Sequence, residues 1–224
     1  MNRVPFLLAS TTALAVLAAA PAAAPAQGGW TPVDSVIAVV NQEVVLQSDL
    51  DRRLTAYKAP LAAVKDPGER AKKRIELRKQ IVAGLIDEHL LNQEAMRMGM
   101  GASDAEVDRA IADIKAKNKL DDAGLSKALA EQGLTLGLYR EEMRSQIMQA
   151  KVTNMVLRPR VQMSEEELRA AYDEAKKRDP KRIGSFDEVK QPLAERLFEE
   201  KITREQMRWL VERRNEAYIE MRDK

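Results

Sequence analysis

The chain has no cysteine, a single histidine and few aromatic residues, which make up 4% of the sequence. Without cysteine, disulfides cannot stabilise the fold and thiol chemistry is excluded. Charge of one sign is not in excess either, because 37 lysines and arginines face 35 aspartates and glutamates. The two signs are interspersed, whereas nucleic-acid binding needs a clustered basic face. We therefore expect no nucleic-acid partner.

Recognisable catalytic motifs are missing as well. The glycines fit neither the P-loop nor the dinucleotide fingerprint, and no H-E-x-x-H, C-x-x-C or EF-hand spacing occurs. The only histidine, His89, falls among the apolar residues of a long predicted helix. General acid–base catalysis needs an orienting partner, so we expect His89 to be a packed, hydrogen-bonded core residue. The sequence thus predicts no catalytic residue, no cofactor and no metal site.

The first residues have the three-part layout of a secretory signal. Arg3 precedes a mostly apolar stretch at residues 6–20, and Ala24-Pro25-Ala26 fits the small-residue cleavage pattern. The apolar stretch is too short to span a bilayer comfortably. We predict a signal peptide at residues 1–26 and no stable membrane span after its cleavage. An uncleaved N-terminal anchor is the alternative.

The remaining composition favours α-helix and argues against a large sheet. Four serines stand three residues before an acidic residue, the pattern of a capping box, at Ser48, Ser103, Ser164 and Ser185. The expected fold is mainly α: a compact helical domain with one small β-hairpin at residues 36–46. The predicted helices span residues 48–63, 69–98, 103–117, 122–131, 135–157, 164–177, 185–200 and 203–222.

The order of these pieces resembles a known family. A hairpin at residues 36–46 is followed by Leu-Ile-Asp-Glu-His-Leu-Leu at 85–91 and by Tyr-Arg-Glu-Glu-Met at 139–143. This order resembles the N-terminal domain of the SurA-type periplasmic chaperones. Residues 186–221 resemble the C-terminal segment that returns to that domain.

The resemblance implies a domain organisation. A SurA-like helical chaperone domain is expected at residues 27–163, a helix and short linker at 164–184, and a C-terminal helix pair at 185–224 that packs back on the first domain. Relatives often insert parvulin prolyl isomerase domains before that pair. Here only residues 178–186 occupy the place, too few for such a domain. The chain is therefore expected not to be an enzyme.

The resemblance also implies a function and a compartment. It indicates an ATP-independent holdase in the periplasm of a Gram-negative cell, whose partners are unfolded exported polypeptides such as outer-membrane β-barrel precursors. Two rival hypotheses stay open. The chain is either a dedicated adaptor of an envelope assembly complex, or an isomerase named after its family that lacks the catalytic domain. No oligomeric state is predicted.

The predicted helix at residues 135–157 has two apolar stripes. Such a helix either packs between two elements, or packs on one and offers the other stripe to a ligand. Flexible methionines suit a groove that accepts varied apolar partners, although they also fill irregular cores. The candidate client-binding residues are Tyr139, Met143, Met148, Val152 and Met155. The hairpin is expected either to add a client strand at its edge or to clamp distant parts of the chain together.

Overall fold

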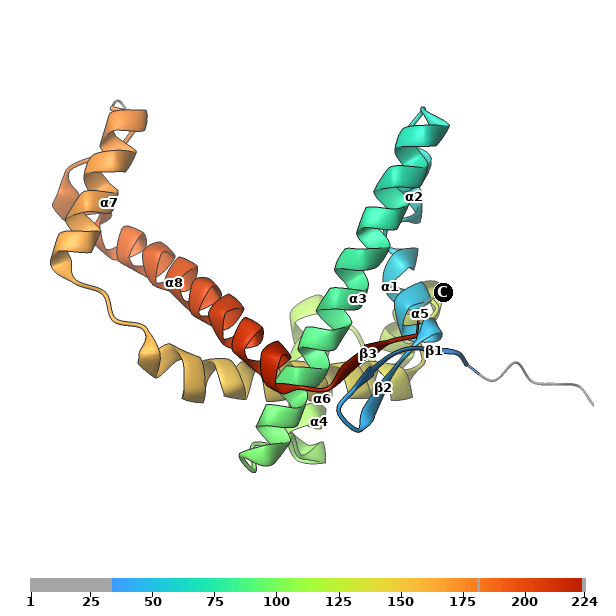
Figure 1. Cartoon of the computed structure of the whole chain (residues 1–224). Helices are drawn as coiled ribbons and strands as arrows, with labels where there is room; N and C mark the ends of the chain where they lie inside the picture. Colours follow the sequence, from blue (N-terminus) through green and yellow to red (C-terminus); the bar gives the residue numbers. More distant parts are fainter. Residues whose placement is uncertain (1–33, 181, 223–224) are drawn as a thin grey trace, which may run out of the picture. The chain divides into compact units, whose positions relative to one another are not determined.

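The computed structural model of the chain describes residues 34–180 and 182–222. The predicted fold class is confirmed there: helices dominate, beside one small sheet (Figure 1). The predicted signal segment, residues 1–26, lies outside the described residues. Among the residues described, no helix is long and apolar enough to cross a membrane. The elements are β1 Val36–Val40, β2 Glu43–Leu46, α1 Gln47–Thr55, α2 Lys58–Ala62, α3 Pro67–Arg97, α4 Asp104–Asn118, α5 Asp122–Glu131, α6 Leu136–Val152, a π-helical turn Thr153–Leu157, a 3-10 turn Arg158–Arg160, α7 Glu165–Arg178, α8 Phe186–Glu216 and β3 Ile219–Met221.

Side-chain caps start most of the helices where the sequence predicts them. Ser103 begins α4 with a complete capping box: its hydroxyl accepts from the Glu106 N–H (3.3 Å), and Glu106 Oε2 accepts from the Ser103 N–H (2.8 Å). Ser164 begins α7 in the same way. The long helix α3 starts two residues earlier than predicted, because Asp66 caps it by accepting from the Glu69 N–H (2.5 Å). Each cap satisfies N–H groups that have no partner inside the helix.

The first predicted helix, residues 48–63, is wrong in two respects. It is broken into α1 and α2, and Ser48 is not its cap. Helix α1 begins one residue earlier, at Gln47, and the Ser48 N–H donates to Asp34 Oδ1 (3.1 Å). Hydrogen bonds from Ser48 lower the pKa of the Asp34 carboxyl. A carboxylate from the segment before β1 thus accepts a hydrogen bond from the first turn of α1. No local sequence pattern predicts this contact.

The sheet brings distant parts of the chain together in the order β2-β1-β3. The predicted helix over residues 203–222 is wrong at its end, because α8 stops at Glu216 and β3 pairs antiparallel with β1. The Asn41 N–H donates to the Tyr218 carbonyl (2.7 Å), and Asn41 Oδ1 accepts from the Tyr218 N–H (2.9 Å). Unpaired backbone groups on β1 favour this pairing over the local helix propensity. The hairpin therefore joins distant parts of the chain, and β3 blocks strand addition at β1, while β2 remains an edge strand of the sheet.

The predicted C-terminal helix pair is also wrong, because α8 is one continuous helix. Ile202, at the predicted break, is buried. The Thr203 hydroxyl donates to the Glu199 carbonyl one turn earlier (3.0 Å), as threonine does inside a helix. Neither glycine nor proline stands at this point. The helical hydrogen bonding therefore continues through it.

Helix α8 packs against α3. Arg214 Nε donates to Asp87 Oδ1 (2.7 Å), and its Nη2 donates to the Ala83 carbonyl (2.9 Å). Trp209 is buried in the same cluster as Leu91 of α3. Charge-assisted contacts and apolar burial thus hold the two longest helices together.

Three apolar clusters form the core. The first lies between the sheet, α1 and α3, the second joins α3, α6 and α8, and the third joins α4, α5 and α6. Helix α6 contributes to two of them: Met143 belongs to the third cluster, while Met148 and Val152 belong to the second. Of the two roles weighed for this helix, packing between two elements is the one observed.

Candidate functional site

The five predicted client-binding residues do not share one surface. Met143, Met148 and Val152 are buried, and Tyr139 is half-buried against the third cluster. Met155, in the π-helical turn after α6, is 61% exposed. In this conformation, Met155 alone of the five presents most of its side chain. Client binding by the set stays a prediction.

Other methionines are exposed as well. Met96 is 64% exposed at the end of α3, and Met98 follows it, also exposed. Met100 packs against the second cluster, of which Met148 is a buried member. We name the exposed residues Met96, Met98 and Met155 the methionine surface. Sequence reasoning missed Met96 and Met98 as surface residues because the long predicted helix placed Met96 on its apolar side.

A lysine of α6 contacts the segment that follows α3 and its exposed methionines. Lys151 Nζ of α6 donates to the Gly101 carbonyl (2.8 Å). Met96 Sδ lies 3.5 Å from where a Cβ on Gly101 would stand, and Met155 follows Lys151 by four residues, one helical turn. Met96 therefore lies beside the residue that Lys151 contacts, and Met155 lies on the helical turn after Lys151.

The contact also includes a carboxylate with an unusual acidity. Lys151 Nζ lies 2.7 Å from Glu106 Oε1, and the Ser103 N–H and hydroxyl donate to Glu106 Oε2 (2.8 and 3.0 Å). The hydrogen bond from Lys151, together with those from Ser103, lowers the pKa of Glu106 to about 2. The start of α4 is thus tied to α6 by a group that stays ionised over nearly the whole pH range.

Replacing Glu106 by glutamine is expected to lower the thermal midpoint at pH 7 while keeping the cap. Since the pKa of this carboxyl is lower in the folded state, its stabilising effect is fully present above about pH 4.5 and is lost as pH falls through about 2. The midpoints of variant and unmodified protein should therefore converge towards pH 2. Calorimetry from pH 7 to 2 measures this. Glu212→Gln, an exposed change on α8, should show no such convergence, and parallel curves for Glu106→Gln would contradict the assignment.

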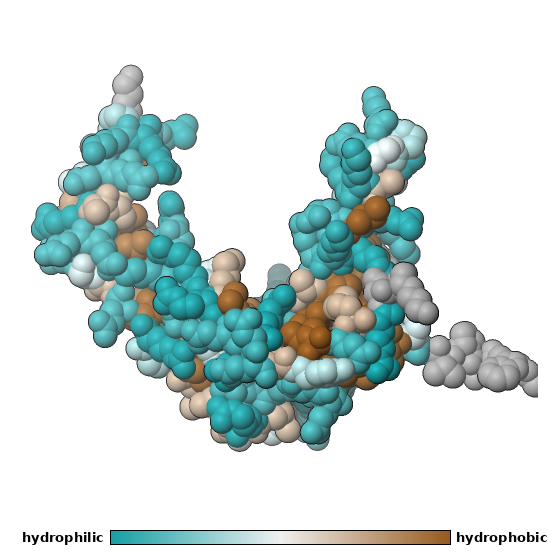
Figure 2. All heavy atoms as spheres, in the orientation of Figure 1, coloured by the Kyte–Doolittle hydropathy of each residue, from teal (hydrophilic) through white to brown (hydrophobic). Residues whose placement is uncertain are grey.

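A second pair of exposed apolar side chains lies on α8. Met207 and Val211 are four residues apart and so share one side of the helix, away from the buried Trp209. Figure 2 shows apolar surface interrupted by charged side chains on the face drawn there. The sequence shows that Met207 and Val211 are spaced to share one side of a helix. This spacing does not predict whether that side faces the solvent or the core.

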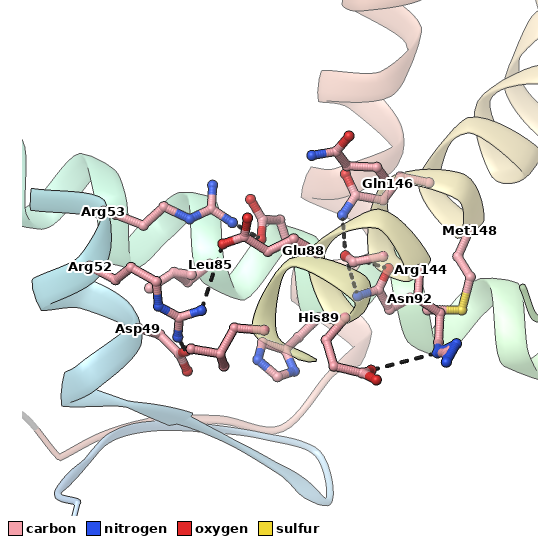
Figure 3. A pocket seen from close by; sticks show the side chains of 15 residues that line it. Asp49, Arg52, Arg53, Leu85, Glu88, His89, Asn92, Arg144, Gln146 and Met148 are labelled. Atoms are coloured by element: carbon pink, nitrogen blue, oxygen red, sulfur yellow. Dashed lines mark hydrogen bonds and ion pairs between the residues drawn. The ribbon is translucent and has the colours of Figure 1, made fainter. Parts of the chain in front are cut away.

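A polar cavity of about 490 Å³ lies between α1, α3 and α6 (Figure 3). Its arginines are matched by acids: Arg53 Nη2 lies 2.7 Å from Glu88 Oε2, and Arg144 Nη2 lies 2.8 Å from Asp104 Oδ1. Arg52 contacts Asp49 as well as Glu142. The arginines of the cavity are therefore paired with acids, and Asn92, Ser145 and Gln149 of its lining are hydrogen-bonded to one another.

His89 lines this cavity and corrects one expectation. It is hydrogen-bonded, as predicted, with Nδ1 2.5 Å from Glu43 Oε2 of β2. However, it stands on the cavity wall rather than in the apolar core, because α3 turns this position towards α1 and β2. Within residues 34–180 and 182–222 no cluster of three or more histidine, aspartate or glutamate side chains is placed to hold a metal ion.

Comparisons with known proteins agree with this architecture. The family model of the SurA N-terminal domain matches residues 33–153, more than half of the chain. Chaperone SurA of Yersinia pestis is 36% identical over 136 residues, which cover 61% of this chain and 31% of that protein. Chaperone SurA of Thiobacillus denitrificans is 34% identical over 155 residues, covering 69% of this chain and 35% of that protein. The chain thus spans about a third of the length of these relatives.

Similarity in structure extends over most of the chain. A solved structure, from a description of PEB4 and the periplasmic protein Cj1289 as SurA-like chaperones of Campylobacter jejuni, matches with a TM-score of 0.58 at 12% identity. The match covers 84% of this chain and 99% of that one. At 12% identity the structural similarity shows only a shared fold. The family relationship rests on the sequence matches. This chain belongs to the family of the SurA N-terminal domain.

Proposed function

We propose that this chain is an ATP-independent periplasmic holdase, which binds unfolded exported polypeptides and keeps them from aggregating. Outer-membrane β-barrel precursors are the proposed clients. The observation that carries the proposal is the exposed methionine surface on a fold of the SurA family. Curated relatives that match the chain over 136 and 155 residues are named chaperones.

Methionine suits such binding for a physical reason. Its unbranched thioether adapts to apolar partners of different shapes, and burying it contributes about 1.5–3 kcal/mol when complete. Met96 and Met155 are more than half exposed, so only part of that contribution is available to each. Weak contacts repeated along a long unfolded client would still give useful affinity, while each contact releases readily.

The five residues predicted from the sequence enter this proposal in two roles. Met155 is proposed as a direct client contact. Tyr139, Met143, Met148 and Val152 are proposed as support, because they lie in the clusters on which α6 packs. Repacking of these clusters would be needed before the buried three could touch a client.

Two alternatives make different predictions. A dedicated adaptor would bind one envelope protein tightly and stoichiometrically, whereas a holdase binds many unfolded chains. An isomerase would accelerate proline isomerisation in a peptide. Residues 179–185 alone connect α7 to α8, where relatives were expected to carry the parvulin insertion. We therefore propose binding without catalysis.

Replacing Met96 and Met155 together by glutamine is expected to weaken holdase activity. About tenfold more variant protein should be needed to suppress light scattering by a urea-unfolded outer-membrane barrel diluted into buffer without ATP. Since both side chains are mostly exposed, the fold should remain intact.

The matched control, Met207→Gln with Met221→Gln, removes two other exposed methionines, from α8 and β3. Equal losses in both variants would show that binding is spread over the surface and would overturn the role of the methionine surface. Unchanged scattering with a tenfold excess of the unmodified protein would instead sink the holdase proposal and favour the adaptor.

A further inference from the structure

Helix α2 and the first half of α3 form an arm that has no fully buried residue, although Ile81 at its end packs against the first cluster. None of the residues of α2 is buried, and the buried residues of α3 begin only at Val82. Figure 1 shows α2 beside this half of α3. The fifteen residues 67–81 correspond to a helix of about 20 Å at 1.5 Å per residue. Such a length of solvated helix is not explained by core packing.

The arm is strongly basic although the whole chain is not. Residues 58–80 hold eight lysines and arginines against three acids, while the chain as a whole has a net charge of +2. The sequence analysis missed this basic cluster because the charges of the whole chain nearly balance. The rest of the chain is correspondingly slightly acidic. A local excess of positive charge on an unpacked arm indicates a partner of opposite charge.

Much of this charge is unsatisfied within the protein. Lys73 pairs with Glu69 (2.7 Å), and Arg70 Nη1 donates to the Val64 carbonyl (3.4 Å). With the described residues, the following side chains form neither an ion pair nor a hydrogen bond: Lys58, Lys65, Lys72, Arg74 and Lys79. Lys58 of α2 and Arg74 of α3 line one cavity, whereas Lys65, Lys72 and Lys79 are not part of its lining.

Apolar side chains stand among these charges. Ile75 is 57% exposed between Lys72 and Lys79, and the three residues share one side of α3 at spacings of three and four. Tyr57, just before α2, is also exposed. Exposed apolar side chains beside flexible lysines are typical of elements that lie at a membrane interface, where the aliphatic stems cover apolar surface.

We propose that the arm formed by α2 and the first half of α3 docks on an anionic lipid surface. A sheet of lipid phosphates presents diffuse negative charge, which matches cations spread over both helices. An acidic peptide held in the cavity beside Lys58 and Arg74 would leave Lys65, Lys72 and Lys79 unpaired. Ile75 and Tyr57 enter the headgroup region while Lys72 and Lys79 contact phosphates. This inference stands apart from the holdase proposal, since the methionine surface takes no part in it.

The test compares binding of the full chain to phosphatidylcholine vesicles with and without phosphatidylglycerol, by co-sedimentation. Binding should require phosphatidylglycerol and should fall steeply with salt, as surface charges are screened. Lys58→Glu, Lys72→Glu and Lys79→Glu together should weaken it about 100-fold or more, at roughly fivefold per lysine. Residues 1–33 are the same in every variant, so their contribution to vesicle binding cancels.

The matched control makes the same charge change elsewhere, at three exposed lysines of α4, α5 and α7: Lys117→Glu, Lys127→Glu and Lys177→Glu. It should bind almost as the unmodified chain does. An equal loss in the control would overturn the proposal in favour of net charge alone. Failure of the unmodified chain to bind phosphatidylglycerol vesicles, with binding to polyglutamate instead, would overturn it in favour of an acidic polypeptide. Helicity measured by circular dichroism confirms that each variant is folded.

Discussion

Replacing Trp209 by alanine is expected to destabilise the protein by about 3–5 kcal/mol, the usual effect of deleting a large buried aromatic side chain. Trp209 is 2% exposed and packs in the second cluster with Leu91 of α3 and Leu157 of the π-helical turn. The Arg213 guanidinium also lies over its ring, 5.7 Å from the centroid. Urea denaturation monitored by far-ultraviolet circular dichroism measures the loss.

The control for this prediction lies two residues further along the same helix. Val211 is 58% exposed, so Val211→Ala should change the unfolding free energy by no more than about 0.5 kcal/mol. The comparison separates the loss of packing from any change in helix propensity. A cost below about 1 kcal/mol for Trp209→Ala would mean that α8 is held by its polar contacts with α3 rather than by the second cluster.

Removing residues 217–224 is expected to cost about 2–4 kcal/mol and to promote self-association. The deletion removes β3 and with it hydrogen bonds such as that from the Arg222 N–H to the Ile37 carbonyl (2.9 Å), each contributing about 1 kcal/mol. It also removes Ala217 and Ile219, which pack against the first cluster. The bared edge of β1 can then pair with another chain. Urea denaturation and size-exclusion chromatography with light scattering measure the two effects.

A change that keeps the strand shows whether the pairing itself matters. Met221→Ser alters an exposed side chain at the end of β3 without removing its backbone groups. This variant should keep the oligomeric state of the unmodified chain and nearly all of its stability. If the truncated chain were as stable as the Met221→Ser variant, the pairing of β3 with β1 would not contribute to the stability of the fold.

Local signals account for what could be predicted from the sequence. Helix starts such as Ser103 and Ser164 were correct because a cap is formed within four residues, all visible in the pattern. The β1–β2 hairpin was correct for the same reason, with Asn41 taking the left-handed conformation (φ 57°) that asparagine tolerates. The mainly α fold follows from composition.

Features that depend on distant contacts could not be predicted in this way. Residues 219–221 have no local preference strong enough to exclude a helix, and only the open side of β1 makes them a strand. The candidate site shows the same limit. Spacing placed Met148 and Met155 on one stripe, but it could not show that α8 and α3 cover Met148 while leaving Met155 exposed.

The pairing of β1 with β3 has a consequence for the order in which the molecule can be made. The hydrogen bond between Asn41 and Tyr218 joins residues 177 positions apart. A ribosome adding about 5–20 residues per second needs roughly 10–35 s to reach the second partner after the first. The pairing of β1 with β3 therefore cannot form before Tyr218 has been added, and until then β1 has one side unpaired.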